Sequence, residues 1–91
     1  MDDDLLGVIK LFPYQFEPRG YFLCDGRRLS VSQHTALYSL LGNTYGGNGT
    51  TDFALPDMRP VDAAGNKRAH NLDEPRYMIA VMGTYPSRPD Y

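Results

Sequence analysis

The sequence contains no tryptophan, one cysteine and two histidines among its 91 residues. The single cysteine, Cys24, excludes a disulfide framework within the chain, and its place in an aromatic run indicates a buried, inert thiol. His34 and His70 lie far apart in the sequence, and together with isolated aspartates they lack the spacing of a zinc or calcium site. The sequence therefore predicts no metal ion and no other cofactor held by one chain, while a metal site shared between chains stays open.

The chain also lacks an excess of basic charge and any long apolar run. Nine Lys and Arg residues face eleven Asp and Glu residues, which gives a net charge of −2, and the basic residues are scattered. This pattern does not favour nucleic-acid binding. The start, Met1-Asp2-Asp3-Asp4, is acidic where a secretory signal has a basic region, and no stretch approaches a membrane-spanning length. We expect no nucleic-acid partner, no membrane insertion and no signal peptide.

The length fits one small domain with a marginal core. A chain of this size buries only about 60–65% of the surface that its unfolded state exposes, so self-association would add stability. Nine glycines and seven prolines indicate short strands and many turns, and seven tyrosines supply much of the apolar surface.

Two strands are predicted near the start of the chain. Residues 5–12 form an apolar run rich in strand formers, and Pro13 closes it. Residues 17–20 have the proline and glycine of a type I turn, and the aromatic run at residues 21–24 follows as a second strand.

A hairpin and a closing strand are predicted from two further patterns. Asp25-Gly26 is typical of a tight hairpin turn with two positive-φ residues, after which residues 27–29 would return along the second strand. The apolar run at residues 77–82 predicts a strand buried on both faces, with the first strand among its neighbours.

One principal helix is predicted over residues 31–41. Ser30 and Gln33 have the spacing of a capping box, and Gly42 lies where a positive-φ residue ends a helix. An apolar stripe with helical spacing is formed by His34, Leu37, Tyr38 and Leu41, and Leu40 widens it. The sequence thus predicts an α+β fold with short strands, a hairpin and one principal helix.

Residues 42–51 are rich in glycine, but they do not form a phosphate-binding loop. A phosphate loop precedes the helix that binds the anion, whereas this segment follows a helix, and it lacks a terminal Lys-Ser or Lys-Thr. We expect a tight, close-packed loop with unusual backbone angles instead. Residues 61–75 are polar and lack periodicity, which predicts a surface loop.

The residue types used in nucleophilic catalysis are sparse. Cys24, His34 and His70 have no spacing that implies a pair, and the sequence predicts no enzyme. Asp57 follows Leu55-Pro56 and lies two positions before Arg59, so a charged hydrogen bond between the two side chains would stabilise a chain reversal.

Several short motifs occur in an ordered series along the chain. They are Pro18-Arg19-Gly20-Tyr21, Cys24-Asp25-Gly26, Leu29-Ser30-Val31-Ser32-Gln33, Leu37-Tyr38-Ser39-Leu40-Leu41-Gly42, Thr44-Tyr45-Gly46-Gly47-Asn48-Gly49 and Phe53-Ala54-Leu55-Pro56-Asp57. This series closely resembles the phage tail collar domain, in the branch of the microcystin-dependent proteins. Residues 77–88 are similar to the closing strand and tail of that branch, and the region before them is shorter than in relatives.

The resemblance implies one tail-collar-like domain over residues 1–91. Its motif-bearing core would span residues 8–59, a shortened loop residues 60–76, and a closing strand and tail residues 77–91. The structural motif residues would be Gly20, Asp25, Gly26, Gly42, Gly46, Gly47, Gly49, Pro56, Asp57 and Arg59.

The resemblance also implies a non-enzymatic structural subunit of a tail fibre or another extracellular appendage. Such a subunit would be cytoplasmic before assembly, and its partners would be copies of itself, as a trimer or filament, and other tail or appendage proteins. We expect the contacts to use the N-terminal segment and residues 83–91, with Tyr45, Tyr85, Pro86 and Tyr91 as candidate interface residues. The alternative is a small module that binds a cell-surface glycan or receptor through Tyr45 and the glycine-rich loop.

Overall fold

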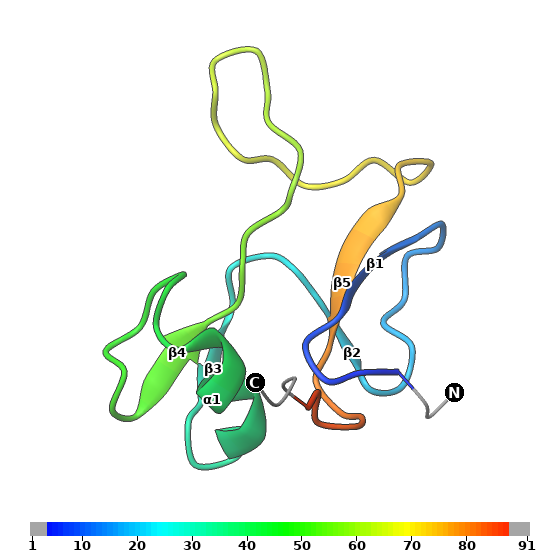
Figure 1. Ribbon diagram of the computed structural model, residues 1–91. Helices are drawn as coiled ribbons and strands as arrows, with labels where there is room; N and C mark the ends of the chain where they lie inside the picture. The colour runs from blue at the N-terminus through cyan, green and yellow to red at the C-terminus, as the bar shows by residue number, and fades with distance from the viewer. Residues whose placement is uncertain (1–3, 88–91) are drawn as a thin grey trace.

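The computed structural model describes residues 4–87, which form two small antiparallel sheets and one short helix (Figure 1). In chain order the elements are β1 (Ile9–Phe12), β2 (Tyr21–Leu23), β3 (Arg28–Ser30), α1 (Thr35–Leu41), β4 (Asp52–Ala54) and β5 (Arg76–Ala80). The fold is thus broadly α+β, as the sequence predicts, but it is mostly β. The helix in the described part of the chain is too short to cross a bilayer.

The larger sheet has the order β1-β5-β2, with β5 in the centre. Ile79 of β5 lies opposite Ile9 of β1 on one side and Phe22 of β2 on the other. Met78, Ile79 and Ala80 have no exposed surface. The prediction of a closing strand next to the first strand is therefore confirmed, but β5 ends at Ala80 instead of Met82, and Tyr77 and Met82 are exposed, so the predicted segment is not buried throughout.

The predicted hairpin is wrong. β3 pairs with β4 in a separate two-stranded sheet, and β2 pairs with β5 instead. Gly26 has a φ of 80°, but no residue other than glycine has a positive φ in the described part, so Asp25 does not supply the second left-handed position that the turn needs. The backbone N–H of Gly26 donates to the carbonyl of Pro56, and the chain crosses from one sheet to the other.

The turn before β2 is shifted by one residue from its predicted place. The N–H of Tyr21 donates to the carbonyl of Pro18 over 3.0 Å, so the turn spans residues 18–21. Gly20, at the third position, has a φ of 86°. A positive φ at that position is the signature of a type II turn and not of the predicted type I turn.

The helix begins four residues later than predicted, at Thr35. Ser30 is the last residue of β3, and its hydroxyl lies 2.9 Å from that of Ser32 instead of capping a helix. His34 occupies the N-cap position without a side-chain hydrogen bond. Gly42 ends the helix and has the predicted positive φ, at 60°, but its ψ of −155° lies outside the left-handed helical region; its N–H donates to the carbonyl of Tyr38.

The main core lies between α1, the second sheet and one face of the larger sheet. Its buried members include Cys24, Leu37, Phe53, Leu55 and Ile79. Tyr38 and Leu41 pack against this cluster, whereas Leu40 is exposed and does not widen the buried stripe as predicted.

Residues 61–75 form the predicted surface loop, and Figure 1 shows them extending away from the sheets. A short antiparallel bridge joins Val61 and Lys67 at its outer end. Where the loop leads back toward β5, the two terminal guanidinium nitrogens of Arg68 donate to the carboxylate of Glu74, over 2.8 and 2.7 Å.

Candidate functional site

Two Asp-x-Arg segments meet where the chain crosses between the sheets. Asp25 and Asp57 face each other in an antiparallel bridge. In each segment the arginine donates its backbone N–H and its Nε to Oδ1 of the aspartate two residues before it, over 3.1 and 3.1 Å for Arg27 and over 3.2 and 2.9 Å for Arg59. The predicted charged hydrogen bond between Asp57 and Arg59 is therefore confirmed.

The backbones approach closely at this crossing. A Cβ atom on Gly26 would lie 3.3 Å from Cβ of Asp57, and the N–H of Met58 donates to the carbonyl of Cys24 over 2.8 Å. The side-chain hydrogen bond from Arg59 lowers the pKa of Asp57 to about 2. The motif residues Asp25, Gly26, Pro56, Asp57 and Arg59 thus come together, and the contacts between them join the two sheets.

The glycine-rich loop is tightly packed, as the sequence predicts. Gly46, Gly47 and Gly49 all have positive φ. A Cβ atom on Gly47 would lie 2.5 Å from Cα of Phe53 and 2.7 Å from the carbonyl oxygen of Asp52, distances that a side chain does not tolerate.

Side chains also bond within this loop. Oδ1 of Asn48 accepts from the N–H groups of Thr50, Thr51 and Asp52, and Oδ1 of Asp52 accepts from the N–H of Asn48. Tyr45 lies on the same loop with its side chain half exposed. Its role at an interface or a glycan site stays a prediction.

The candidate nucleophile is buried. Cys24 is 1% exposed, and burial raises the pKa of its thiol to about 12, so almost none of it is thiolate at neutral pH. His34 packs edge-on against Phe22, with ring centroids 6.0 Å apart. Within residues 4–87, no group of three His, Cys, Asp or Glu side chains is placed to hold a metal ion.

A shallow cavity of about 350 Å³ collects charged side chains that the sequence does not connect. It is lined by Asp25, Arg59, His70 and Arg76, among others. Burial and then the positive charge of Arg76 lower the pKa of His70, which favours its neutral form. Arg76 itself is buried and donates to the carbonyls of Glu74 and Asn71, so its guanidinium supports the return of the surface loop.

The segments expected to form contacts between subunits pair with each other inside the chain. Leu5 and Thr84 form a parallel bridge, in which the N–H of Leu6 donates to the carbonyl of Thr84 and the N–H of Thr84 to that of Asp4. A Cβ atom on Gly83 would lie 2.3 Å from the Asp4 carbonyl oxygen. This pairing fixes where the C-terminal segment leaves the sheet.

Beyond this bridge, Tyr85 is bound to the helix. Its hydroxyl lies 2.7 Å from that of Ser39, yet half of its side-chain surface stays exposed. Pro86 is partly buried. Tyr91, the remaining candidate interface residue of this segment, lies outside the described residues.

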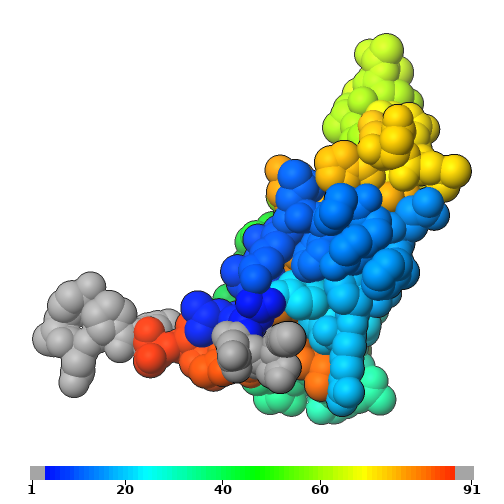
Figure 2. Space-filling view, turned by 90° about the vertical axis from the view of Figure 1, so that its right-hand side faces the viewer, coloured from blue at the N-terminus to red at the C-terminus, as the bar shows by residue number. Residues whose placement is uncertain are grey.

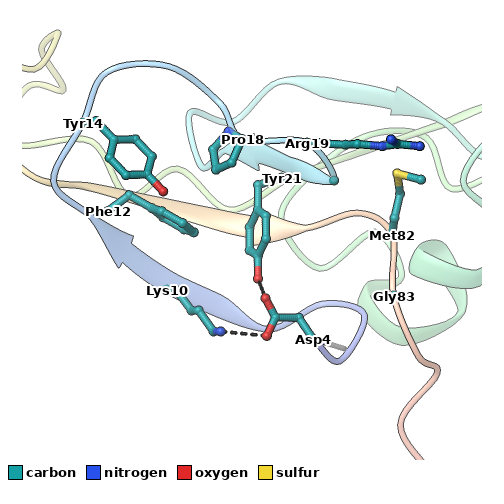
Figure 3. A pocket seen from close by; sticks show the side chains of 10 residues that line it. Asp4, Lys10, Phe12, Tyr14, Pro18, Arg19, Tyr21, Met82 and Gly83 are labelled. Atoms are coloured by element: carbon teal, nitrogen blue, oxygen red, sulfur yellow. Dashed lines mark hydrogen bonds and ion pairs between the residues drawn. The ribbon is translucent and has the colours of Figure 1, made fainter. Parts of the chain in front are cut away.

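A groove of about 660 Å³ opens beside β1 and β2 (Figure 3). We call it the aromatic groove, and its principal lining side chains are Phe12, Tyr14, Pro18, Arg19, Tyr21 and Met82. The rings are in mutual contact, since the centroid of Phe12 lies 4.9 Å from that of Tyr21 and 5.6 Å from that of Tyr14. Tyr14 stacks in turn on Phe16, with centroids 4.4 Å apart and planes at 10°.

Charged groups lie at one side of the aromatic groove. The Asp4 carboxylate accepts from Nζ of Lys10 over 2.7 Å and from the hydroxyl of Tyr21. Figure 3 shows Lys10 and Asp4 below the rings of Phe12 and Tyr14, with the hydroxyl of Tyr21 pointing toward Asp4. This groove does not follow from the sequence patterns, because its residues come from separate segments, although the alternation Phe12-x-Tyr14-x-Phe16 is a local signal of an aromatic row.

Comparison with known proteins places the motif series in a family. The phage tail collar domain family matches residues 7–61 of the chain. Protein RhiB of Rhizobium leguminosarum bv. viciae is 35% identical over 60 residues, which cover 63% of this chain and 27% of that protein. The chain thus matches about a quarter of the length of that relative. No solved structure is significantly similar to the chain.

The crossing, the packed glycine loop and the paired terminal segments define a small, mostly β domain whose motif residues support its architecture. The family match spans more than half of the sequence, and the chain belongs to the phage tail collar domain family. That family is a structural one of phage tails, as the motif series in the sequence implies. Its microcystin-dependent branch stays a prediction for this chain.

Proposed function

We propose that the chain is a non-enzymatic structural subunit that associates with copies of itself in a phage tail fibre or a related extracellular appendage. The assembly would be a trimer or a filament, and other tail proteins would be further partners. Membership of the collar family supports a place in a phage tail. The observation that carries self-association is an exposed apolar patch on the larger sheet.

This apolar patch consists of Ile9, Leu11 and Tyr77. Their exposed fractions are 37%, 53% and 40%. Leu11 lies directly opposite Tyr77 in the strand register, and Ile9 follows on the same face of β1 because side chains alternate along a strand. Contiguous apolar surface of this kind marks sites of protein contact.

The position of β1 adds to this argument. Among the described strands, β1 pairs with β5 alone and forms one edge of the larger sheet. An edge strand offers backbone N–H and C=O groups to another chain, and charge is one means of preventing such pairing. β1 carries a charged side chain only at Lys10, on the face opposite the apolar patch. The edge and the patch together form a surface suited to a second subunit.

Electron microscopy of the purified protein tests this proposal. We expect regular particles, either rings of uniform size or filaments with a repeat. The variant Leu11→Lys would place a charge in the apolar patch and reduce the number of particles, while Leu72→Lys, at an exposed leucine of the surface loop, would leave them unchanged. A field of isolated small particles for the unchanged protein at high concentration would contradict the proposal.

A second candidate function is a small glycan- or receptor-binding module of a tail fibre. The observation that favours it is the exposed ring of Tyr45 beside the glycine-rich loop, because aromatic faces pack on apolar ligand surfaces. Oxygens of Asn48 and Asp52 are already bonded inside the loop, so Tyr45 would supply the main contact. Binding to a glycan array that Tyr45→Ala abolishes would support this function, and binding by neither protein would reject it.

A further inference from the structure

We propose that the aromatic groove binds the proline-rich tail, residues 85–91, of a second copy of this chain. This inference rests on the proposed self-association and names the contact that it requires; the apolar patch would add stability to that contact but would not hold two copies together alone. The tail reads Tyr85-Pro86-Ser87-Arg88-Pro89-Asp90-Tyr91. Four features support this contact. They are the shape of the groove, the spacing of the prolines, the charges on the groove and on the tail, and the direction in which residues 84–87 leave the sheet.

The aromatic groove has the construction of a proline receptor. Domains that bind proline-rich segments do so with rows of aromatic side chains, against which the proline rings pack. Here Phe12, Tyr14 and Tyr21 form such a row, in which Tyr21 is largely buried, and Pro18 lies beside the rings (Figure 3). Since Tyr14 is stacked on Phe16, its ring is already held in place before a ligand arrives. Rings that are held in advance lose little freedom on binding.

The tail has the matching sequence pattern. Pro86 and Pro89 are separated by two residues. A polyproline II helix has about three residues per turn, so both proline rings lie on one side of it. Proline also restricts the free tail toward this extended form, which lowers the entropy lost when it is bound.

The charges of the two surfaces are complementary. The groove contains an acidic side chain, Asp4, that is partly exposed, and two exposed basic ones, Lys10 and Arg19. The tail offers one charge of each sign, Arg88 and Asp90. The Asp4 carboxylate has room for a second cation beside Lys10, because an ionised carboxylate has about four acceptor positions.

Residues 84–87 are directed away from the groove of their own chain. Met82 and Gly83 line the groove, but Thr84 is then held by its bridge to Leu5 and Tyr85 by its hydrogen bond to Ser39 on α1. Figure 2 shows residues 84–87, in orange to red, projecting from one side of the molecule. Residues 84–87 thus lead away from the groove of their own chain, which leaves that groove open to the tail of a neighbour.

A contact between the tail of one copy and the groove of the next is heterologous, because it joins two different surfaces. Such contacts close into a ring when the rotation between subunits allows it, and otherwise they continue as a filament. This predicts a test by complementation, using two variants of the full chain. Tyr14→Ala damages the groove and leaves the tail intact, whereas Pro86→Ala/Pro89→Ala damages the tail and leaves the groove intact.

Light scattering would measure the mass of each protein and of their mixture. We expect the unchanged protein to have several times the monomer mass of 10.2 kDa, and each variant alone to have the monomer mass. An equimolar mixture should form particles of about twice the monomer mass, since one intact groove receives one intact tail and the pair then has no further partner. Tyr14→Phe keeps the ring and should associate like the unchanged protein.

Two controls separate this contact from general effects. Leu72→Ala removes an exposed apolar side chain of the surface loop, and Pro60→Ala/Pro75→Ala removes two prolines outside the tail. Both should associate normally, and all variants should have the circular dichroism spectrum of the folded protein. Variants that associate as fully as the unchanged protein would overturn this inference and leave the proposed function standing. Monomeric variants that form no pairs on mixing would also overturn it. An unchanged protein that is always monomeric would overturn both.

Discussion

At the residue scale, the glycines differ in what surrounds them. Gly47 and Gly42 both have positive φ, at 92° and 60°. Around Gly47, backbone atoms of Asp52 and Phe53 occupy the space of a side chain, whereas nothing lies within 4 Å of a Cβ on Gly42. Backbone cannot move aside as the end of a flexible side chain can, so the two positions separate the effect of backbone angle from the effect of close approach.

We expect Gly47→Ala to reduce the free energy of unfolding by about 3 kcal/mol or more, because a left-handed backbone strain and an overpacked contact add. Gly42→Ala is the control in which only the backbone conformation is strained, and it should lose about 1–3 kcal/mol. Urea unfolding followed by circular dichroism measures both. Equal losses for the two variants would show that the loop relaxes around the added methyl group.

A second prediction at this scale concerns acid. The hydrogen bond from Arg59 lowers the pKa of Asp57 from 3.8 to about 2, and that from Arg68 lowers the pKa of Glu74 from 4.5 to about 2. The folded protein therefore keeps these carboxylates ionised at a pH where the unfolded chain binds protons. Their contribution to stability is fully present above about pH 4.5 and is lost as the pH falls toward 2.

Asp57→Asn should weaken this dependence on pH. We expect the variant to be less stable than the unchanged protein at neutral pH, and the difference to shrink between pH 4 and pH 2. The control is Asp73→Asn, which replaces a carboxylate by an amide in the same way but in the surface loop. Thermal unfolding at a series of pH values measures the effect, and a difference that stays constant down to pH 2 would count against the Asp57–Arg59 pair.

At the scale of elements, strands with a clear apolar or aromatic run were predictable from the sequence. The strands that they pair with were less predictable. The apolar run in β5 and the aromatic run in β2 identify both strands, since few other structures bury such segments. The sequence Asp25-Gly26 is compatible with a hairpin, but the same residues also permit a crossing between sheets. Contacts with Pro56 and Asp57, which are distant in the sequence, favour the crossing over the hairpin.

At the helix start, too, contacts with distant residues override a local sequence pattern. Ser30 and Gln33 have the spacing of a capping box, yet Ser30 pairs with Asp52 as part of β3. The hydroxyl of Ser30 bonds to that of Ser32, and His34, with a φ of −131° and a ψ of 47°, interrupts the helical backbone before Thr35. Of the candidate site, the Asp57–Arg59 pair was predictable because both residues are close in sequence, and the aromatic groove was not, because tertiary structure assembles it.

A substitution at Ser30 tests the helix start directly. A true Ser cap loses about 0.5–2 kcal/mol when replaced by alanine. Because the hydroxyl of Ser30 bonds only to that of Ser32 among the described contacts, we expect Ser30→Ala to lose less than about 0.5 kcal/mol. Leu37→Ala, inside the core, should lose about 2–5 kcal/mol in the same urea titration. A loss at Ser30 of a full cap would contradict the observed start at Thr35.

At the scale of the whole molecule, apolar side chains are divided between two small clusters and the surface. The buried clusters center on Phe53 and Ile79 in one case and on Met78 in the other. The apolar patch of Ile9, Leu11 and Tyr77 lies outside both buried clusters. The aromatic groove borders the second cluster, since Tyr21 belongs to that cluster and Phe12 packs against it. A small collar domain with this distribution gains stability when a second subunit covers its exposed surfaces.

The central claim is that this collar domain associates with itself. Its most direct test is the mass of the unchanged protein measured by light scattering over a wide range of concentration. We predict a mass above the monomer value of 10.2 kDa that rises with concentration until a ring closes or continues to rise as filaments grow. A mass that stays at the monomer value at every concentration would contradict the claim.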